Sequence, residues 1–215
     1  MSSLKNKQVV ITAGPTREPI DPVRYLSNRS SGKMGYAIAA AARNAGANVT
    51  LISGPASLSS PQDITFIKVN TANEMLEAVM SVISDCDIFI AAAAVVDYRP
   101  LHIEPKKIKK SGDEMTLTLV RNPDILDAVS HLSRRPICIG FAAETDNLIK
   151  HAKEKLKKKN LDMIVANPVG QNQGFDSDDN EAIIIMADGS RHTLEKQPKE
   201  KLAAAIISYA KHLAT

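Results

Sequence analysis

Apolar runs with strand spacing and with helix spacing alternate along most of the chain. The strand-like runs predict strands over residues 9–13, 48–53, 64–69, 87–96, 137–142 and 161–166. Between and after them, apolar residues at helical spacing predict helices over 33–45, 71–84, 123–133, 147–159 and 199–213. Strands that alternate with helices in this way build βαβ units. We therefore predict an α/β fold with a Rossmann-like, doubly wound, mostly parallel sheet.

Two segments depart from this alternation. Residues 181–187 and 191–195 are strand-like and flank Asp188-Gly189, a strong turn dipeptide, so they predict a C-terminal hairpin over about 181–195. Residues 99–122 lack helical spacing and predict an extended arm or hairpin. An isolated two-stranded ribbon is marginal in water, so the arm should pack on a partner, most simply a second copy in a homodimer. Residues 1–215 as a whole are expected to form a single domain.

The connection between the first strand and the first helix is unusually long. It runs from Gly14 to Gly35, whereas such connections take about 2–6 residues and structureless loops beyond about 12–15 are usually functional or disordered. Its three prolines, three arginines, three serines and Asn28 make it stiff, polar and suited to an anion. Gly32 and Gly35 would let backbone N–H groups approach phosphate oxygens at a helix start. A serine N-cap, with glycines for close helix–sheet packing, explains the same residues equally well.

The two common nucleotide-binding fingerprints do not fit this connection. A dinucleotide site needs G-x-G-x-x-G after the first strand, but no second glycine follows Gly14 before Gly32. A phosphate-binding P-loop needs Ser or Thr after its Gly-Lys pair, where this chain has Met34. A nicotinamide oxidoreductase is therefore disfavoured.

Composition narrows the classes of function further. The net charge of 27 − 24 = +3 is too small to indicate a nucleic-acid partner, and the absence of tryptophan leaves few platforms for base stacking. No apolar run approaches the roughly 20 residues of a membrane span, and no signal peptide precedes the first strand, so we expect a cytoplasmic protein. Cys86 and Cys138 lack metal-type spacing and are interpreted as reduced packing residues.

Motifs spread in order over essentially the whole chain resemble those of one family. They occupy residues 11–35, 92–99, 106–110, 122–125, 140–145, 155 with 159, and 174–177. The chain resembles phosphopantothenoylcysteine synthetase of coenzyme A biosynthesis, in its bacterial, CTP-using form. In many bacteria this unit is the C-terminal half of a fusion with a flavin-dependent decarboxylase. The abrupt start of the chain favours an excised half over a free-standing enzyme, and both remain open.

The resemblance implies a ligase that joins an acid to an amino acid. The carboxylate of 4′-phosphopantothenate would attack the α-phosphate of CTP to give an acyl-cytidylate and pyrophosphate. The amine of L-cysteine would then displace CMP, with Mg²⁺ as the accompanying ion and its ligands unassigned. The protein would contribute positioning and charge stabilisation rather than a covalent nucleophile. Two alternatives remain: the same chemistry with ATP, and a non-catalytic, lysine-rich module that binds nucleotide or RNA.

The resemblance also implies roles for individual residues. Asn28 would hold the acyl-cytidylate for attack by cysteine, and Lys107 in the arm would assist its formation, with a one-residue slip in this lysine cluster left open. Asp97 would contact CTP and help to position Mg²⁺ through water. The other expected nucleotide contacts are Ser31, Gly32, Asn122, Pro123, Asp124, Ile125, Phe141, Lys155 and Lys159. Structural alternatives are a turn or cap for Asn28, a helix cap or salt bridge for Asp97, a core position for Phe141, and a solvated helix face for the two lysines.

Overall fold

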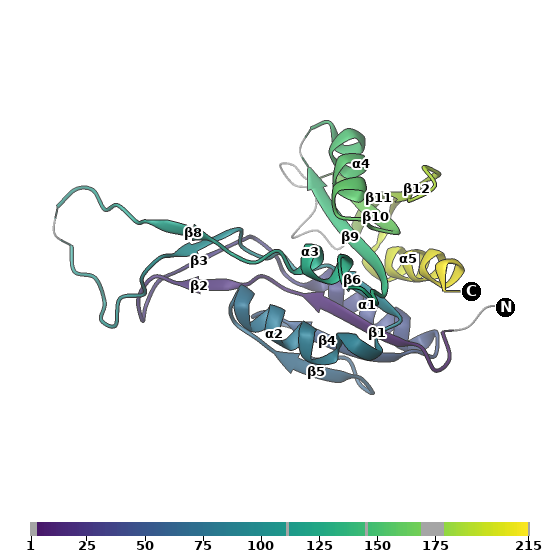
Figure 1. Ribbon diagram of the computed structural model, residues 1–215, viewed down its shortest axis with the longest axis horizontal. Helices are drawn as coiled ribbons and strands as arrows, with labels where there is room; N and C mark the ends of the chain where they lie inside the picture. The colour runs from purple at the N-terminus through teal and green to yellow at the C-terminus, as the bar shows by residue number, and fades with distance from the viewer. Residues whose placement is uncertain (1–3, 111, 145, 169–178, 215) are drawn as a thin grey trace.

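The computed structural model describes residues 4–110, 112–144, 146–168 and 179–214. Its centre is an eight-stranded sheet with the strand order β12-β11-β10-β9-β6-β1-β4-β5 (Figure 1). Every pairing from β5 to β10 is parallel, and β11 and β12 add an antiparallel hairpin at one edge. The strands are β1 (Gln8–Ala13), β4 (Asn48–Ser53), β5 (Thr65–Lys68), β6 (Ile88–Ala91), β9 (Ile137–Glu144), β10 (Met163–Pro168), β11 (Asp179–Met186) and β12 (Arg191–Pro198).

The parallel strands follow the order of a doubly wound sheet. In chain order they lie 3-2-1-4-5-6 across the sheet, with the reversal between β1 and β6. The predicted fold class and the C-terminal hairpin are therefore confirmed. A reversal of this kind opens a crevice at the carboxyl ends of the neighbouring strands, where such sheets bind ligands.

Helices cover both faces of the sheet. Helices α1 (Lys33–Asn44) and α5 (Lys199–Leu213) pack on one face, with Ile38 and Ile206 in its core. On the other face lie α2 (Ala72–Val82), α3 (Ile125–Ser130) and α4 (Leu148–Lys158), and a short 3₁₀ turn, Ile83–Asp85, follows α2. No helix in the described ranges is long and apolar enough to cross a membrane.

The long connection after β1 contains a hairpin that the sequence did not predict. Strands β2 (Arg17–Pro19) and β3 (Tyr25–Ser27) pair antiparallel. The buried carboxylate of Glu18 accepts from the backbone N–H of Ala72 at 2.9 Å and so joins this hairpin to the start of α2. Because this contact spans 54 residues, local sequence patterns carry no sign of it.

The expected arm is present and lies against this hairpin. Strands β7 (Tyr98–Pro100) and β8 (Leu119–Arg121) pair antiparallel at its base, and the chain between them extends away from the sheet (Figure 1). Ile108 in the arm donates its backbone N–H to Oδ2 of Asp21 at 3.1 Å. The arm is therefore held at its base, at Glu104, whose N–H donates to the carbonyl of Ile20 at 3.0 Å, and near its middle at Ile108.

Two predicted elements are shorter in the structure. The strand expected over 87–96 ends at Ala91, because the following N–H groups bond to threonine hydroxyls: Ala93 to Oγ1 of Thr12 in β1 and Val96 to Oγ1 of Thr16 in the long connection. The helix expected over 123–133 covers only Ile125–Ser130, because its N-cap is Asp124.

Candidate active site

A cavity of about 490 Å³ opens at the carboxyl ends of the parallel strands. One side comes from residues 28–35 of the long connection and from residues 92–97 after β6. The end of β9, parts of β10 and β11, and the first turn of α5 complete the walls. The cavity thus lies at the switch point of the sheet, where a ligand is expected.

The first turn of α1 faces this cavity without a capping side chain. Its N-cap is Gly32, whose φ of 77° suits glycine, so the expected serine N-cap is wrong. Close packing by glycine is confirmed at Gly35, where a Cβ would come within 2.5 Å of the Cβ of Ala13. The approach of α1 to β1 and the N–H groups at its start favour an anion in the cavity.

Asn28 lies in the wall of the cavity, directly after β3. Its Nδ2 donates to the carbonyl of Val95 at 2.9 Å, which joins the long connection to the segment after β6. The neighbouring Ser27 fixes the backbone further by donating from Oγ to the carbonyl of Thr16 at 2.8 Å. An amide carries two N–H donors and one oxygen, so Asn28 can keep this bond and still contact a ligand.

Phe141 of β9 and Lys155 of α4 share another wall of the cavity. The Nζ of Lys155 donates to the carbonyl oxygen of Phe141 at 2.7 Å. Lys155 is half-buried, so the alternative that placed it on a solvated helix face is wrong. Its ammonium brings a positive charge to the cavity, as binding of a nucleotide requires.

Asp97 is the one carboxylate that lines the cavity within the described part of the chain. Its carbonyl accepts from the N–H of Asn122 at 2.8 Å, and the Nδ2 of Asn122 donates to the carbonyl of Val96 at 2.7 Å. Arg99 donates to Oδ1 of Asn122 at 3.2 Å. Asn122 therefore holds the base of the arm, and its contact with a nucleotide stays a prediction.

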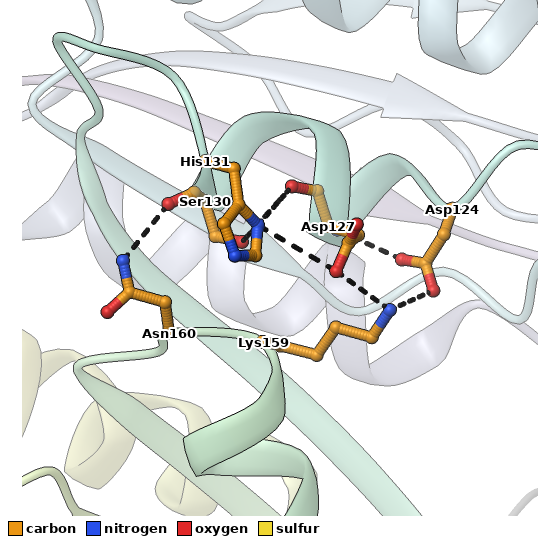
Figure 2. A network of polar contacts seen from close by, with 6 residues as sticks. All are labelled: Asp124, Asp127, Ser130, His131, Lys159 and Asn160. Carbon is orange, nitrogen blue, oxygen red and sulfur yellow. Dashed lines mark hydrogen bonds and ion pairs between the residues drawn. The ribbon is translucent and has the colours of Figure 1, made fainter.

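Lys159 and Asp124 form an ion pair that joins the end of α4 to the start of α3 (Figure 2). Lys159 also donates to Oδ1 of Asp127 at 3.0 Å, and Oδ1 of Asp124 accepts from the N–H of Asp127 as the helix cap. Burial disfavours both charges, but the pairing outweighs it: the pKa of Lys159 is raised and the pKa of Asp124 is lowered. Lys159, like Lys155, is therefore not simply a solvated residue.

Lys107 is exposed in the arm and does not line the cavity. Its neighbour Ile108 is held on both sides: Asp21 accepts from its N–H, and Arg24 donates to its carbonyl at 3.1 Å. Asp21 is fully buried in its side chain and accepts from the Arg24 guanidinium at 2.6 Å. The Arg24 guanidinium, helped by backbone N–H donors, holds the pKa of Asp21 far below its usual range despite burial.

The structure divides the predicted site residues into two groups. Lining the cavity are Asn28, Ser31, Gly32, Asp97, Phe141 and Lys155. Not lining it are Lys107, Asn122, Pro123, Asp124, Ile125 and Lys159. The motif over 174–177 lies outside the described residues. Ile125, the first residue of α3, is buried in the core, which gives it a packing role whatever else it contacts.

Sequence reasoning did not name Arg29, Ser30 and Lys33 of the cavity wall, although they lie in the motif over 11–35, and it missed three further polar wall residues. They are Asn167 at the end of β10, Asn180 in β11 and Lys199 at the start of α5. None of the three falls within a motif that carries the family resemblance. Only the approach of β11 and α5 to the switch point could have indicated these residues. The alternation of strands and helices in the sequence does not reveal that approach.

The two cysteines are buried or half-buried free thiols, as expected. Burial raises the pKa of Cys86 to about 12 and the pKa of Cys138 to about 11. Both therefore stay protonated at neutral pH, which excludes either as a ready thiolate nucleophile.

Comparison with known proteins agrees with the resemblance drawn from the motifs. The family described as "DNA/pantothenate metabolism flavoprotein C-terminal domain" matches residues 4–213. The coenzyme A biosynthesis bifunctional protein CoaBC of Vibrio vulnificus (strain CMCP6) is 53% identical over 192 residues, which cover 87% of this chain and 48% of that protein. CoaBC of Escherichia coli (strain K12) is 50% identical over 212 residues, with coverages of 96% and 52%. The chain therefore spans about half the length of the curated relatives it matches.

A solved structure shows the same relationship in three dimensions. The crystal structure of the C-terminal domain of CoaBC superposes with a TM-score of 0.85 at 40% identity, covering 99% of this chain and 98% of that one. Family match, sequence relatives and shared fold all extend over nearly the entire chain. The chain thus belongs to the family of the DNA/pantothenate metabolism flavoprotein C-terminal domain.

Proposed function

We propose that this chain is a CTP-dependent phosphopantothenate–cysteine ligase of coenzyme A biosynthesis. The observation that carries the proposal is the cavity at the switch point, where Asn28, the start of α1 and Lys155 face one space. An amide, a row of N–H groups and an ammonium suit a reaction between anionic substrates. The relatives are named for coenzyme A biosynthesis. A mutant of Cab2, which shares the fold at 18% identity, was solved with phosphopantothenate-cysteine.

The first step would activate the acid. A carboxylate oxygen of 4′-phosphopantothenate attacks the α-phosphorus of CTP, the bond to the β-phosphate breaks, and pyrophosphate leaves with its electron pair. The N–H groups at the start of α1 and the ammonium of Lys155 would hold the phosphates and stabilise their charge. For Lys107 to assist this step, the arm must carry it from its exposed position to a bound nucleotide.

The second step would form the amide. The amine of L-cysteine attacks the acyl carbon, a proton leaves the nitrogen, and collapse of the tetrahedral intermediate expels CMP. Asn28 would donate its second N–H to the acyl oxygen as that oxygen gains charge, while the first remains on the carbonyl of Val95. This role explains why an amide lies in the wall beside the phosphate-binding turn.

Mg²⁺ fits the cavity as an ion bound to the nucleotide. Mg²⁺ keeps several waters and binds through one or two carboxylates together with substrate phosphates, and Asp97 provides such a carboxylate. Among the residues that the structure describes, no cluster of three or more His, Cys, Asp or Glu forms a separate metal site. When bound, the ion would neutralise charge on the phosphates.

The arm and the β2–β3 hairpin would form the surface of a homodimer. Apart from Met80, every large exposed apolar side chain among the described residues lies on these two ribbons: Val23, Tyr25, Tyr98, Leu101, Ile103, Met115 and Leu119. Exposed apolar patches of this kind mark interaction surfaces. Light scattering coupled to size exclusion should give twice the mass of the chain, and Leu101→Asp with Leu119→Asp should shift it toward the monomer.

The relatives named as bifunctional proteins are about twice as long as this chain. We propose that the natural protein carries a flavin-dependent decarboxylase as its other half, acting on the product of the ligase. The present chain supplies the ligase step alone in this scheme.

One assay tests the proposed function and its rivals together. Pyrophosphate release is measured with CTP or ATP, with and without 4′-phosphopantothenate and L-cysteine. We expect release that requires the acid and prefers CTP, with CMP and the amide appearing once cysteine is added. A preference for ATP would mean that ATP, and not CTP, is the co-substrate. If neither nucleotide gives pyrophosphate release that depends on the acid, a non-catalytic binding module is favoured.

A further inference from the structure

Lys199 is a buried lysine in the wall of the cavity. Its side chain is the first of α5, and the residue is only 4% exposed. Beside it in the same wall lies Asn180 of β11, which is 8% exposed. Within the described ranges no other lysine or arginine is buried. Burial of an ammonium costs free energy unless other groups compensate for the lost hydration.

The fold by itself opposes a charge at this place. A cation at the first position of a helix lies at the positive end of the helix dipole and is disfavoured there. Lys199 already has a contact inside the protein, and a bound anion would add to that contact in offsetting desolvation and the dipole of the helix.

The surroundings of Lys199 match an anion in shape and charge. Helix α5 packs along α1, and the first turns of both helices line the cavity, with Gly32 and Gly35 on α1 and Lys199 on α5. The N–H groups at the start of one helix and the lysine at the start of the other thus border the same cavity. An ammonium has three donors, so Lys199 can keep a contact inside the protein and still bind a ligand oxygen.

We propose that Lys199, with Asn180, binds a phosphoryl group of an anionic substrate of this cavity. The proposal rests on the proposed ligase function and adds a phosphate contact to the residues expected from the resemblance. The phosphoryl group has two possible sources, the triphosphate of the nucleotide and the terminal phosphate of 4′-phosphopantothenate. Both present tetrahedral, doubly charged oxygen groups to which a buried ammonium donates strong hydrogen bonds.

The kinetic test replaces the charge and keeps the length of the side chain. For Lys199→Met we expect the KM for either CTP or phosphopantothenate to rise about tenfold or more, as befits loss of a hydrogen bond to a charged group. The substrate whose KM rises identifies the source of the phosphate. Lys199→Arg should recover most of the affinity, and Lys201→Met, an exposed change on the same helix, should match the wild type. If both KM values of a folded Lys199→Met equal those of Lys201→Met, the proposal is wrong.

A second variant and a binding assay distinguish loss of the phosphate contact from misfolding and from failure of the proposed function. Asn180→Asp keeps the shape of the side chain and adds a negative charge, so it should raise the same KM. Inorganic tripolyphosphate and inorganic phosphate should raise the melting temperature of the wild-type chain and of Lys201→Met, and raise that of Lys199→Met less. Equal shifts in all three proteins would overturn the phosphate contact, even if the chain made no amide. If the shifts differ but the wild type releases no pyrophosphate, the ligase function alone is wrong.

Discussion

The Nζ of Lys159 lies 2.6 Å from Oδ2 of Asp124, although the two residues are 35 positions apart in the chain. This ion pair joins α4 to the loop before α3, and both of its members were expected to contact a nucleotide. In the described structure the two charges satisfy one another outside the cavity wall. A nucleotide that binds Lys159 must therefore compete with Asp124 and with Asp127.

Loss of this ion pair should have a small, pH-dependent effect on stability. Because the Asp124 carboxylate is half exposed, solvent screens the pair, and Lys159→Met should lower the free energy of unfolding at pH 7 by about 0.5–1 kcal/mol. The pKa of Asp124 is lowered in the folded protein, so the contribution is present above its ordinary value of 3.8 and is lost as pH falls through the lowered pKa.

Urea unfolding at pH 7 and near pH 3 measures this difference. The gap between wild type and Lys159→Met should shrink at the lower pH, whereas Lys158→Met, an exposed neighbour on α4, should match the wild type at both. A gap that stays constant with pH would show that the ion pair with Asp124 is not the source of the stability difference.

Local patterns predicted the sheet and its helices because burial imposes a period on them. Helix α5 and strand β4 occupy the predicted residues, since their apolar positions face a single core. The structure departs from the predicted elements where hydrogen bonds to polar groups distant in sequence determine the backbone conformation. The end of β6 is set by the hydroxyls of Thr12 and Thr16, and the β2–β3 hairpin is held by Glu18 at the start of α2.

The candidate site was predictable only where a motif covers it. The motif around Asn28 gave both the residue and its segment, and the structure places it in the cavity wall. Lys199 escaped prediction because a lysine after a proline at a helix start looks like a solvated residue. Its burial depends on how α5 packs beside α1, which is a property of the folded sheet.

Asp21→Asn should release the middle of the arm. Asp21 accepts from Val23, from Arg24 and from Ile108, so the neutral amide would lose the ion pair and weaken the bond to the arm. Hydrogen exchange of the Ile108 amide should become faster, while exchange in β1 stays the same. Asp113→Asn, an exposed change in the arm, is the matched control. Unchanged protection at Ile108 would show that contacts other than the one with Asp21 hold the middle of the arm.

The same contact predicts how the arm responds to acid. The folded-state pKa of Asp21 is far below that of the free side chain, mainly because of Arg24. Its stabilising effect is therefore fully present above the ordinary pKa of 3.8 and persists until pH falls through the much lower folded value. Protection of Ile108 should stay constant from pH 8 to pH 5, and a loss in that window would contradict the assignment.

Lys107→Gln should abolish pyrophosphate release without affecting the fold. The side chain is exposed, so no packing is lost, and only the charge that would reach the phosphates disappears. We expect a fall in the rate of the first step of about 100-fold or more, in line with removal of a group that stabilises transition-state charge. Lys110→Gln is the matched control. If Lys106→Gln loses activity and Lys107→Gln does not, the role in the first step belongs to Lys106.

Asn28→Asp should separate the two steps of the proposed reaction. The change is isosteric, but a carboxylate can donate neither to the carbonyl of Val95 nor to an acyl oxygen, and it repels the charge that develops on the acyl oxygen. Activation of the acid does not need that donor, so pyrophosphate release should continue until the intermediate fills the site. Attack by cysteine should fall by about 100-fold or more, as on loss of an oxyanion donor. Rapid-quench measurement should then show a burst of pyrophosphate without amide, and the exposed change Asn44→Asp should leave both steps intact. Normal amide formation by Asn28→Asp would mean that the second step needs neither an N–H donor at this position nor the bond to Val95.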